Sequence, residues 1–369
     1  MADGSVEAAE RRKLSGAVVT ASDVWRVVLG FAVGVSGSLV FLYLSLPLPW
    51  FLGSLTFSLV ASVLNAPIAR PTALSTSMRA VLGVAVGTAF TPALLANVGG
   101  MVGSLSILVP FMFLIIIGGT VFFERYARFD RPTAFFCAVP GGLTDMVTMA
   151  ADAGANARAV TLIQATRIVM ILFLLPIWLQ WGGGVTIATA LPRGVRFADL
   201  NLVDALVLLA LGWVGWRLAA RLGLAGAPLV GPMLLSGIAH AVGLTSARMP
   251  AEILIFAQVS LGILLGTQFR GLTLPEFSTT MIWGIAFSLV LMIVTAAVAL
   301  VVSRITGLDS TSVLLAYAPG GQTEINLLAY ILGLDAAFTA LHHLVRLAVV
   351  IFGAQIVFAT NTTWRKGSG

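Results

Sequence analysis

The sequence predicts an all-α protein that crosses a membrane many times, and composition, apolar runs and an internal repeat together carry this prediction. Apolar residues make up 59% of the chain and charged residues only 10%, whereas an average soluble domain carries about 25% charged residues. The mean hydropathy is +1.01, and apolar runs of spanning length follow one another closely. A soluble fold of 369 residues could not bury this much apolar surface. We therefore expect a polytopic membrane protein.

The second half of the chain repeats the pattern of the first at a shift of 179 positions, which carries residue 71 to residue 250. Residues 82–90 (LGVAVGTAF) then align with residues 261–269 (LGILLGTQF), and PGGLTD at 140–145 aligns with PGGQTE at 319–324. A duplicated apolar half with broken helices and intramembrane charges is typical of proteins that move solutes across membranes. The sequence therefore predicts two tandem membrane repeats.

Each repeat contains six apolar segments, joined by short loops. They lie at about 25–46, 49–65, 74–90, 102–123, 132–153 and 157–180, and at about 200–221, 227–243, 251–269, 279–303, 311–332 and 336–360. The expected organisation is an N-terminal tail (1–23), membrane repeat 1 (24–181), a polar linker (182–199), membrane repeat 2 (200–361) and a C-terminal tail (362–369). The first 23 residues lack the apolar core of a signal peptide, so we interpret them as a cytoplasmic tail.

The fifth segment of each repeat decides how often the chain crosses the membrane. A Pro-Gly-Gly sequence interrupts it, because proline lacks a backbone donor and glycine accepts most backbone angles. A straight break gives six crossings per repeat, whereas a chain that folds back gives five crossings plus a re-entrant hairpin, and inverted repeats. We expect 10 to 12 membrane segments and favour the inverted arrangement. Loop Lys and Arg show the same cytoplasmic excess under both arrangements, and both place the two termini in the cytoplasm.

Four ionisable residues lie deep within apolar segments: Asp145, Glu324, Arg167 and Arg346. A charge at the centre of a bilayer is costly, so these side chains must face protein or water. Their matched positions predict two ion pairs, Asp145 with Arg167 and Glu324 with Arg346. Such pairs either hold each broken helix to the helix that follows it or bind a solute or a coupling ion.

The Pro-Gly-Gly breaks have the features of a binding site. A half-helix that starts at Leu143 or Gln322 presents free N–H groups and the positive end of its dipole, while the glycine carbonyls can coordinate a cation. A kink that serves only packing is the alternative. The predicted solute- or ion-binding residues are Pro140, Gly141, Gly142, Thr144, Asp145, Arg167, Pro319, Gly320, Gly321, Gln322, Thr323, Glu324, Asn326, His343 and Arg346.

The second repeat is the more polar one, since it carries Asn326, His342 and His343 where the first has Val147, Ile163 and Gln164. The two histidines precede Arg346 by about one helical turn and either relay protons or are satisfied within the core. The Gly-x-x-x-Gly motifs at 83–87 and 262–266 indicate close helix packing rather than a binding loop. With a single cysteine and three histidines, we expect no metal centre, no catalytic residue and no cofactor.

The pattern Pro-Gly-Gly-x-Thr-[Asp/Glu]-[Met/Ile] at 140–146 and 319–325, together with PLVGPM at 228–233, resembles the bacterial AbrB-type membrane protein family over about 25–360. The first repeat departs from it at 49–54 (PWFLGS), where serine replaces the second proline. The resemblance implies a multi-pass protein of the bacterial inner membrane. Members of the family are often labelled as ammonia monooxygenases or as regulators of gene expression.

The residues favour an ion-coupled secondary transporter of a small solute, driven by Na⁺ or H⁺ because no nucleotide-binding motif is present. The two arginines favour an anion or carboxylate as this solute, unless both are neutralised within the protein. A membrane-embedded ligand sensor that regulates gene expression without transport is the alternative. A metal-dependent monooxygenase is the least favoured hypothesis, and we expect no enzymatic activity. The expected partners are the solute and membrane lipid and no nucleic acid, and a homodimer is left open.

Overall fold

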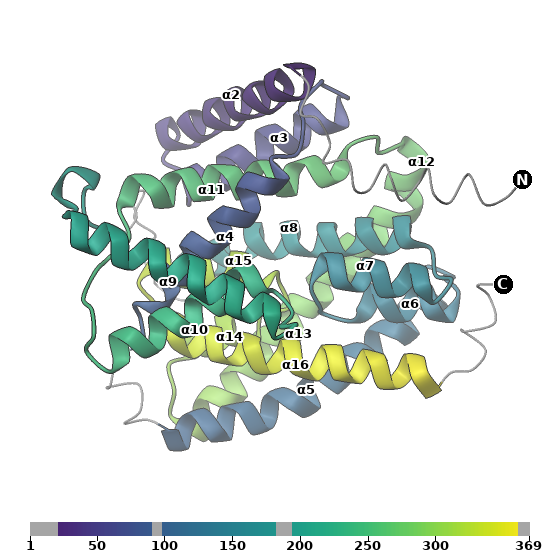
Figure 1. The fold of residues 1–369 in the computed structure, drawn as a ribbon. Helices are drawn as coiled ribbons and strands as arrows, with labels where there is room; N and C mark the ends of the chain where they lie inside the picture. Colours follow the sequence, from purple (N-terminus) through teal and green to yellow (C-terminus); the bar gives the residue numbers. More distant parts are fainter. Residues whose placement is uncertain (1–20, 91–97, 182–193, 361–369) are drawn as a thin grey trace, which may run out of the picture.

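The structure is a computed structural model that describes residues 21–90, 98–181 and 194–360. The described part of the chain is helical (Figure 1). Its first half contains α2 (Ala21–Tyr43), the π-helical turn η1 (Pro49–Gly53), α3 (Ser54–Val63), α4 (Thr72–Gly87), α5 (Val98–Arg125), α6 (Arg131–Ala138), α7 (Leu143–Asp152) and α8 (Ala157–Trp181). Most of the two predicted tails and residues 182–193 of the predicted linker lie outside the described residues.

The second half is also helical. It contains η3 (Phe197–Asp199), α9 (Leu202–Arg221), α10 (Ala227–Ala241), α11 (Ala251–Gly266), η4 (Thr267–Phe269), α12 (Leu274–Glu276), η5 (Phe277–Met281), α13 (Ile282–Thr306), α14 (Ser310–Tyr317), α15 (Gln322–Leu332) and α16 (Ala336–Thr360). Every predicted apolar segment is helical, and the two that contain Pro-Gly-Gly are each split into two helices.

Seven helical stretches in the described residues are long and apolar enough to cross a membrane, as expected for a multi-pass protein. They are Val24–Tyr43, Gly100–Arg125, Ala157–Gln180, Leu202–Arg221, Ala251–Phe269, Phe277–Thr306 and Ala336–Gly353. Three more apolar helices, Pro49–Val63, Thr72–Gly87 and Ala227–Ala241, are shorter. A helix of this length extends for about 23 Å, less than the roughly 30 Å hydrocarbon core. The predicted 10 to 12 segments therefore include three that do not reach spanning length alone.

The first broken segment folds back on itself. The N–H of Asn156, just before α8, donates to Thr133 Oγ1 at the start of α6 (2.9 Å), and Arg167 in the middle of α8 donates to Val139 O at the end of α6 (3.3 Å). Helices α6 and α8 therefore run in the same direction. Because α7 leaves the end of α6 and finishes a few residues before α8 begins, it must return antiparallel to α6.

The second broken segment reverses in the same way. His343 Nε2 lies 3.2 Å from Leu315 O, and Arg346 donates to Ala318 O at 2.6 Å, so α14 and α16 also run in the same direction. Helix α15 ends only a few residues before α16 begins. In Figure 1 the α6–α7 pair lies to the right and the α14–α15 pair to the left of centre. We call these two pairs the hairpins.

The Gly-x-x-x-Gly motifs mark close packing between the two halves of the chain, as predicted. A Cβ placed at Gly83 of α4 would overlap the carbonyl oxygen of Leu229 in α10. A Cβ placed at Gly262 of α11 would lie 2.7 Å from the carbonyl oxygen of Phe51 in η1, just before α3. Only glycine allows helices to approach this closely. The short helices α4 and α10 therefore pack closely against each other, and α11 packs closely against η1 and α3.

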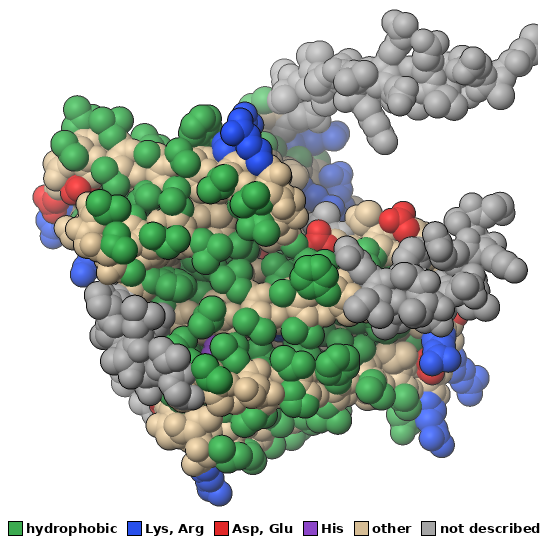
Figure 2. Space-filling view, turned by 60° about the horizontal axis from the view of Figure 1, so that its bottom comes forward, with side chains coloured by type: hydrophobic (Ala, Val, Ile, Leu, Met, Phe, Trp, Pro, Cys, Tyr) green, Lys and Arg blue, Asp and Glu red, His purple; other side chains and the backbone are tan. Residues whose placement is uncertain are grey.

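The outer surface is largely apolar. Figure 2 shows one face on which hydrophobic side chains predominate, while Lys, Arg, Asp and Glu gather at its edges. Large apolar side chains on the long helices are exposed, such as Leu209 (69%), Trp213 (64%) and Ile293 (70%). Exposure of this kind is costly in water and favourable in lipid. The surface therefore agrees with a chain that crosses the membrane several times.

Candidate functional site

Each hairpin tip is a short extended segment created by the Pro-Gly-Gly sequence. The backbone leaves α6 at Val139 (φ −62°, ψ 123°) and enters α7 after Gly142 (φ −66°, ψ 133°). Ala318 (φ −57°, ψ 123°) and Gly321 (φ −65°, ψ 136°) have nearly the same angles. The prediction that both glycine pairs are non-helical is therefore confirmed. Each tip places the C-terminus of one half-helix beside the N-terminus of the next.

The two buried arginines bind the C-terminal ends of the first half-helices. Arg346 donates to the carbonyl oxygens of Ala318 (2.6 Å) and Gly320 (2.9 Å). Arg167 donates to the carbonyl oxygen of Val139 at 3.3 Å and to the side chain of Gln164. The last carbonyls of a helix lack intrahelical partners and carry the negative end of the dipole, so a guanidinium both satisfies and neutralises them.

The predicted direct pairing of Asp145 with Arg167 and of Glu324 with Arg346 is therefore wrong. Within the described residues, no ion pair of 4 Å or less joins either arginine to a carboxylate. The reason is geometric: each arginine reaches the end of the first half-helix, whereas each acid lies in the first turn of the second half-helix. The arginines thus hold the tips together, and the acids are left facing elsewhere.

The acids face a cavity of about 470 Å³ that both hairpin tips line. Seven of the predicted binding residues line it: Gly141, Gly142, Asp145, Gly321, Gln322, Thr323 and Glu324. Its volume lies within the roughly 300–1,000 Å³ that is usual for small-molecule sites. The remaining walls come from the start of α4, from α8, α10 and α16, and from the end of α11. The fold thus brings the two Pro-Gly-Gly motifs, 179 positions apart, to one place.

Both carboxylates fold back over the N-terminus of their own helix. A Cβ added at Gly142 would lie 2.7 Å from Asp145 Oδ2, and one added at Gly321 would overlap Glu324 Oε2. A negative charge is stabilised at the N-terminus of a helix, so this position suits a carboxylate. The second glycine of each motif is needed because a side chain there would displace the acid. Glu324 is only 6% exposed.

Arg79 of α4 is the basic residue that acts on both acids. It lines the cavity with Asp145 and Glu324 and interacts electrostatically with each of them. Sequence analysis missed it. The signal that could have identified it is its place within the apolar segment 74–90, where an arginine is costly unless it is paired. One guanidinium thus lines the same cavity as two carboxylates that come from different halves of the chain.

The histidine pair is satisfied within the core rather than placed in the cavity. His342 Nδ1 lies 2.9 Å from Phe338 O, and its Nε2 lies 2.9 Å from Ser104 Oγ. His343 Nε2 lies 3.2 Å from Leu315 O, and its Nδ1 lies 3.5 Å from a guanidinium nitrogen of Arg346. Since a carbonyl oxygen only accepts hydrogen bonds, each ring donates on that side; His343 accepts on the other side, where its partner is a guanidinium, and the second partner of His342 is a hydroxyl group that can donate to it. This geometry favours two neutral imidazoles over a proton relay.

Other predicted residues also lie outside the cavity lining. These are Pro140, Pro319, Gly320, Arg167, Arg346, His343 and Asn326. Asn326 is fully buried, and neither of its amide atoms has a hydrogen-bond partner among the described residues. The structure does not describe the side chain of Thr144. In the same described part of the chain, no group of three His, Cys, Asp or Glu side chains could hold a metal ion.

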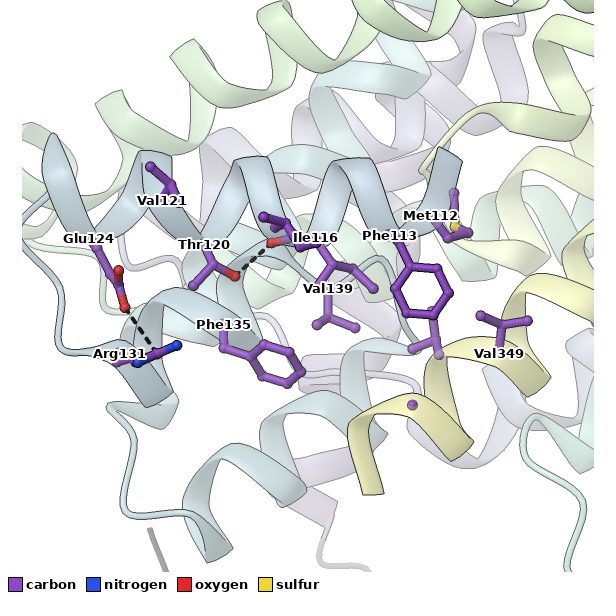
Figure 3. A pocket seen from close by; sticks show the side chains of 13 residues that line it. Met112, Phe113, Ile116, Thr120, Val121, Glu124, Arg131, Phe135, Val139 and Val349 are labelled. Atoms are coloured by element: carbon purple, nitrogen blue, oxygen red, sulfur yellow. Dashed lines mark hydrogen bonds and ion pairs between the residues drawn. The ribbon is translucent and has the colours of Figure 1, made fainter. Parts of the chain in front are cut away.

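Two further hollows lie between helices, and both are mainly apolar. A groove of about 300 Å³ runs between α5, α6 and α16 (Figure 3). Phe113, Ile116 and Val349 line it, and the Glu124–Arg131 ion pair (3.7 Å) lies at one end. A hollow of about 570 Å³ lies between α4, α9 and α11 and is lined by Trp213 and Trp216. The cavity between the hairpin tips differs from both because residues of both Pro-Gly-Gly breaks and both acids line it.

The chain is similar to known proteins over most of its length. Residues 50–360 match the family described as transition state regulatory protein AbrB. The "Uncharacterized protein YhjN" of Bacillus subtilis (strain 168) is 28% identical over 240 residues, which span 62% of this chain and 62% of that relative. The "Putative regulator AbrB" of Escherichia coli (strain K12) is 22% identical over 343 residues, which span 90% of this chain and 95% of that relative.

Proposed function

Because the chain belongs to the AbrB family, whose pattern covers residues 50–360, we propose that it is an ion-coupled secondary transporter of a small polar solute. The solute binds in the cavity between the hairpin tips. The observation that carries this proposal is that both tips and both acids line one cavity of about 470 Å³. Broken helices that meet at a charged cavity are the usual substrate site of transporters built from repeats. The solute crosses the membrane without covalent change.

An inverted arrangement of the two halves supports the transport mechanism. Helices α4 (Thr72–Gly87) and α11 (Ala251–Gly266) are one matched pair, and each bound of α11 is shifted by 179 positions. The hairpins lie on opposite sides in Figure 1, and the glycines of α4 and α11 pack reciprocally against α10 and against η1 and α3. Both features are expected if an axis in the membrane plane relates two halves, each with five crossings and one re-entrant hairpin. Rocking of one half against the other then exposes the cavity to either side in turn.

Coupling to an ion gradient falls to the two acids in this proposal. Asp145 and Glu324 are the carboxylates that line the cavity. A carboxylate that can take up a proton from water on one side of the membrane and release it on the other can couple transport to a proton gradient. Together with backbone carbonyls of the glycines, a carboxylate can instead bind Na⁺. We place the protein in the bacterial inner membrane, surrounded by lipid, with both termini in the cytoplasm.

The second candidate function is a membrane-embedded sensor that binds its ligand in the same cavity without moving it. The descriptions of the family and of the Escherichia coli relative favour it, since both name a regulator. A sensor needs the cavity and a conformational response, but it needs no access from both sides of the membrane. The two functions therefore differ in flux and not in binding.

Reconstitution into liposomes separates the two functions. We expect purified protein to accumulate at least one labelled solute from a panel of carboxylates, amino acids and polyols when a proton or sodium gradient is imposed. Glu324→Gln should lose this accumulation. Asp152→Asn, an exposed change at the end of α7, should keep it. Ligand binding without flux under either gradient, in liposomes whose orientation and protein content have been verified, would favour the sensor.

A further inference from the structure

We propose that Arg79 is the anion-binding residue of the cavity, and that a small anion takes the place of one negative charge, that of Asp145 or Glu324, when a proton neutralises that carboxylate. The inference builds on the proposed transport function and names its solute class and its coupling ion. The proton comes from the aqueous side and binds a carboxylate oxygen, and no other bond is made or broken. The cavity would then bind an anion and a proton together.

The guanidinium of Arg79 lies in the cavity wall and has unused hydrogen-bond donors. Arg79 lines the cavity together with Asp145 and Glu324 and interacts electrostatically with both acids, although no ion pair of 4 Å or less joins it to either one in the described residues. Its Nε atom is buried and has no hydrogen-bond partner in the described part of the chain. A guanidinium offers five N–H donors in a planar fork that matches a carboxylate or phosphate. Arg79 therefore retains donors that a bound anion can use.

The net charge of the cavity favours an anion only after one acid has been protonated. Two positively charged residues, Arg70 and Arg79, and two negatively charged residues, Asp145 and Glu324, line the cavity. The lining residues from α8, α10, α11 and α16 are apolar, while Gln268 and Gln322 are polar and uncharged. With both acids ionised the four charges cancel, so an anion gains little. One proton leaves an excess positive charge, which a monovalent anion neutralises.

The other buried arginines are not placed to bind an anion in the cavity. Arg167 and Arg346 are 1% and 3% exposed and donate to the carbonyls of the hairpin tips, and Arg167 also donates to Gln164. The Nε atom of Arg167, like that of Arg79, has no hydrogen-bond partner in the described part of the chain. They do not line the cavity. Arg70 lines it but also donates to Thr267 O at 3.3 Å. Arg79 is thus the guanidinium whose counter-ions both belong to the cavity.

Titration calorimetry with purified full-length protein tests this inference. The probes are acetate, succinate, chloride and inorganic phosphate, each added at pH 6 and pH 8 in two buffers of different ionisation enthalpy, which reports the protons taken up per anion. We expect at least one probe to bind with net proton uptake. Its affinity should fall by up to about tenfold per pH unit for each proton taken up.

The variants give results that a merely structural role would not produce. Glu324→Gln should bind the anion more tightly than the wild type at pH 8 and with less proton uptake, because the neutral amide already supplies the excess positive charge. Arg79→Gln should lose binding. Arg79→Lys keeps the charge and loses the fork, so it should bind more weakly while remaining folded. Asp152→Asn and Arg221→Gln, both exposed and absent from the cavity lining, should match the wild type.

Four outcomes would overturn the inference. They are anion binding without proton uptake, binding that requires Na⁺ instead, unchanged binding in Arg79→Gln, and failure of all four probes to bind either the wild type or Glu324→Gln. Each outcome leaves the proposed transport function to the liposome experiment. If the protein binds an anion together with a proton but shows no flux in liposomes, the anion-binding inference stands and the transport function is refuted.

Discussion

The guanidinium of Arg346 donates a hydrogen bond of 2.6 Å to the carbonyl oxygen of Ala318, which precedes it by 28 positions. Arg167 contacts the carbonyl oxygen of Val139 at the same spacing of 28 positions. Each arginine therefore fastens the tip of its hairpin to the helix that follows it. Because the positive charge is neutralised there, the acid on the far side of the break remains available to the cavity.

Removing this fastening should destabilise the protein. Arg346→Ala leaves two carbonyl oxygens at the tip without their charged donor, and we expect a loss of about 2–5 kcal/mol in the free energy of unfolding. Thermal unfolding in detergent measures the change. Arg304→Ala, an exposed change at the end of α13, is the control and should shift the midpoint little. Equal stability of the two variants would show that the carbonyl contacts are dispensable.

The topology of the halves can be read from two exposed arginines at matched positions. Arg125 ends α5 and Arg304 lies in the last turn of α13, 179 positions later. Inverted halves place these residues on opposite sides of the membrane, and parallel halves place them on the same side. We expect Arg125→Cys and Arg304→Cys, each in a Cys137→Ala background, to react with an impermeant maleimide from opposite sides. Labelling of both variants from one side would refute the inverted arrangement.

Neutralising Glu324 should abolish coupling to the ion gradient while leaving solute binding intact. Glu324→Gln keeps the shape of the side chain and removes its titration, so we expect gradient-driven uptake to disappear while solute exchange across liposomes persists. Asp145→Asn should act in the same direction but less severely, because Asp145 is less buried than Glu324. Paired uptake and exchange assays measure the two effects. Continued accumulation of solute by Glu324→Gln would exclude this role.

Close packing between the halves should depend on glycine at one position and not at another. Gly83→Ala places a Cβ against the backbone carbonyl of Leu229, and we expect a cost of about 1–3 kcal/mol in stability. Gly118→Ala serves as the matched control, because nothing lies within 4 Å of an added Cβ there. Chemical or thermal unfolding of both variants measures the difference. A neutral Gly83→Ala would mean that α4 and α10 can separate without cost.

An ion pair between Arg158, at the start of α8, and Glu276, just before the span Phe277–Thr306, gives the protein a defined acid sensitivity. The hydrogen bond from Arg158 (2.9 Å), together with one from the N–H of Thr273, lowers the pKa of Glu276 to about 2. Its pKa in the unfolded chain is about 4.3. The pair therefore stabilises the fold above that value and loses its effect as the pH falls toward 2. The effect should be small, because exposed pairs contribute little.

The measurement is the unfolding midpoint from pH 7 down to pH 3. Glu276→Gln should lower the midpoint at pH 7 and flatten its fall below pH 5, relative to the wild type. Asp152→Asn removes an exposed carboxylate elsewhere and should reproduce the wild-type profile. A Glu276→Gln profile parallel to that of the wild type would mean that Arg158 does not anchor α8 through this contact.

The sequence determined the helices and their interruptions. Run lengths of apolar residues located the helical segments, and Pro-Gly-Gly located the two breaks, because chain stiffness and missing donors act within a few residues. The repeat also identified the acids as residues of the second half-helices. These features are local, so neither the partner helix nor the direction of the chain after the break was needed to predict them.

The tertiary structure alone decided which charges meet. Sequence reasoning paired each acid with the arginine of its own repeat, but each fold-back gives that arginine to the end of the first half-helix. The acids instead share a cavity with Arg79, which an earlier apolar segment of the chain, 74–90, supplies. Burial cost requires a partner for every intramembrane charge, and it does not specify which one. Only the arrangement of the helices in space makes that choice, because electrostatic partners are set by distance and not by position in the chain.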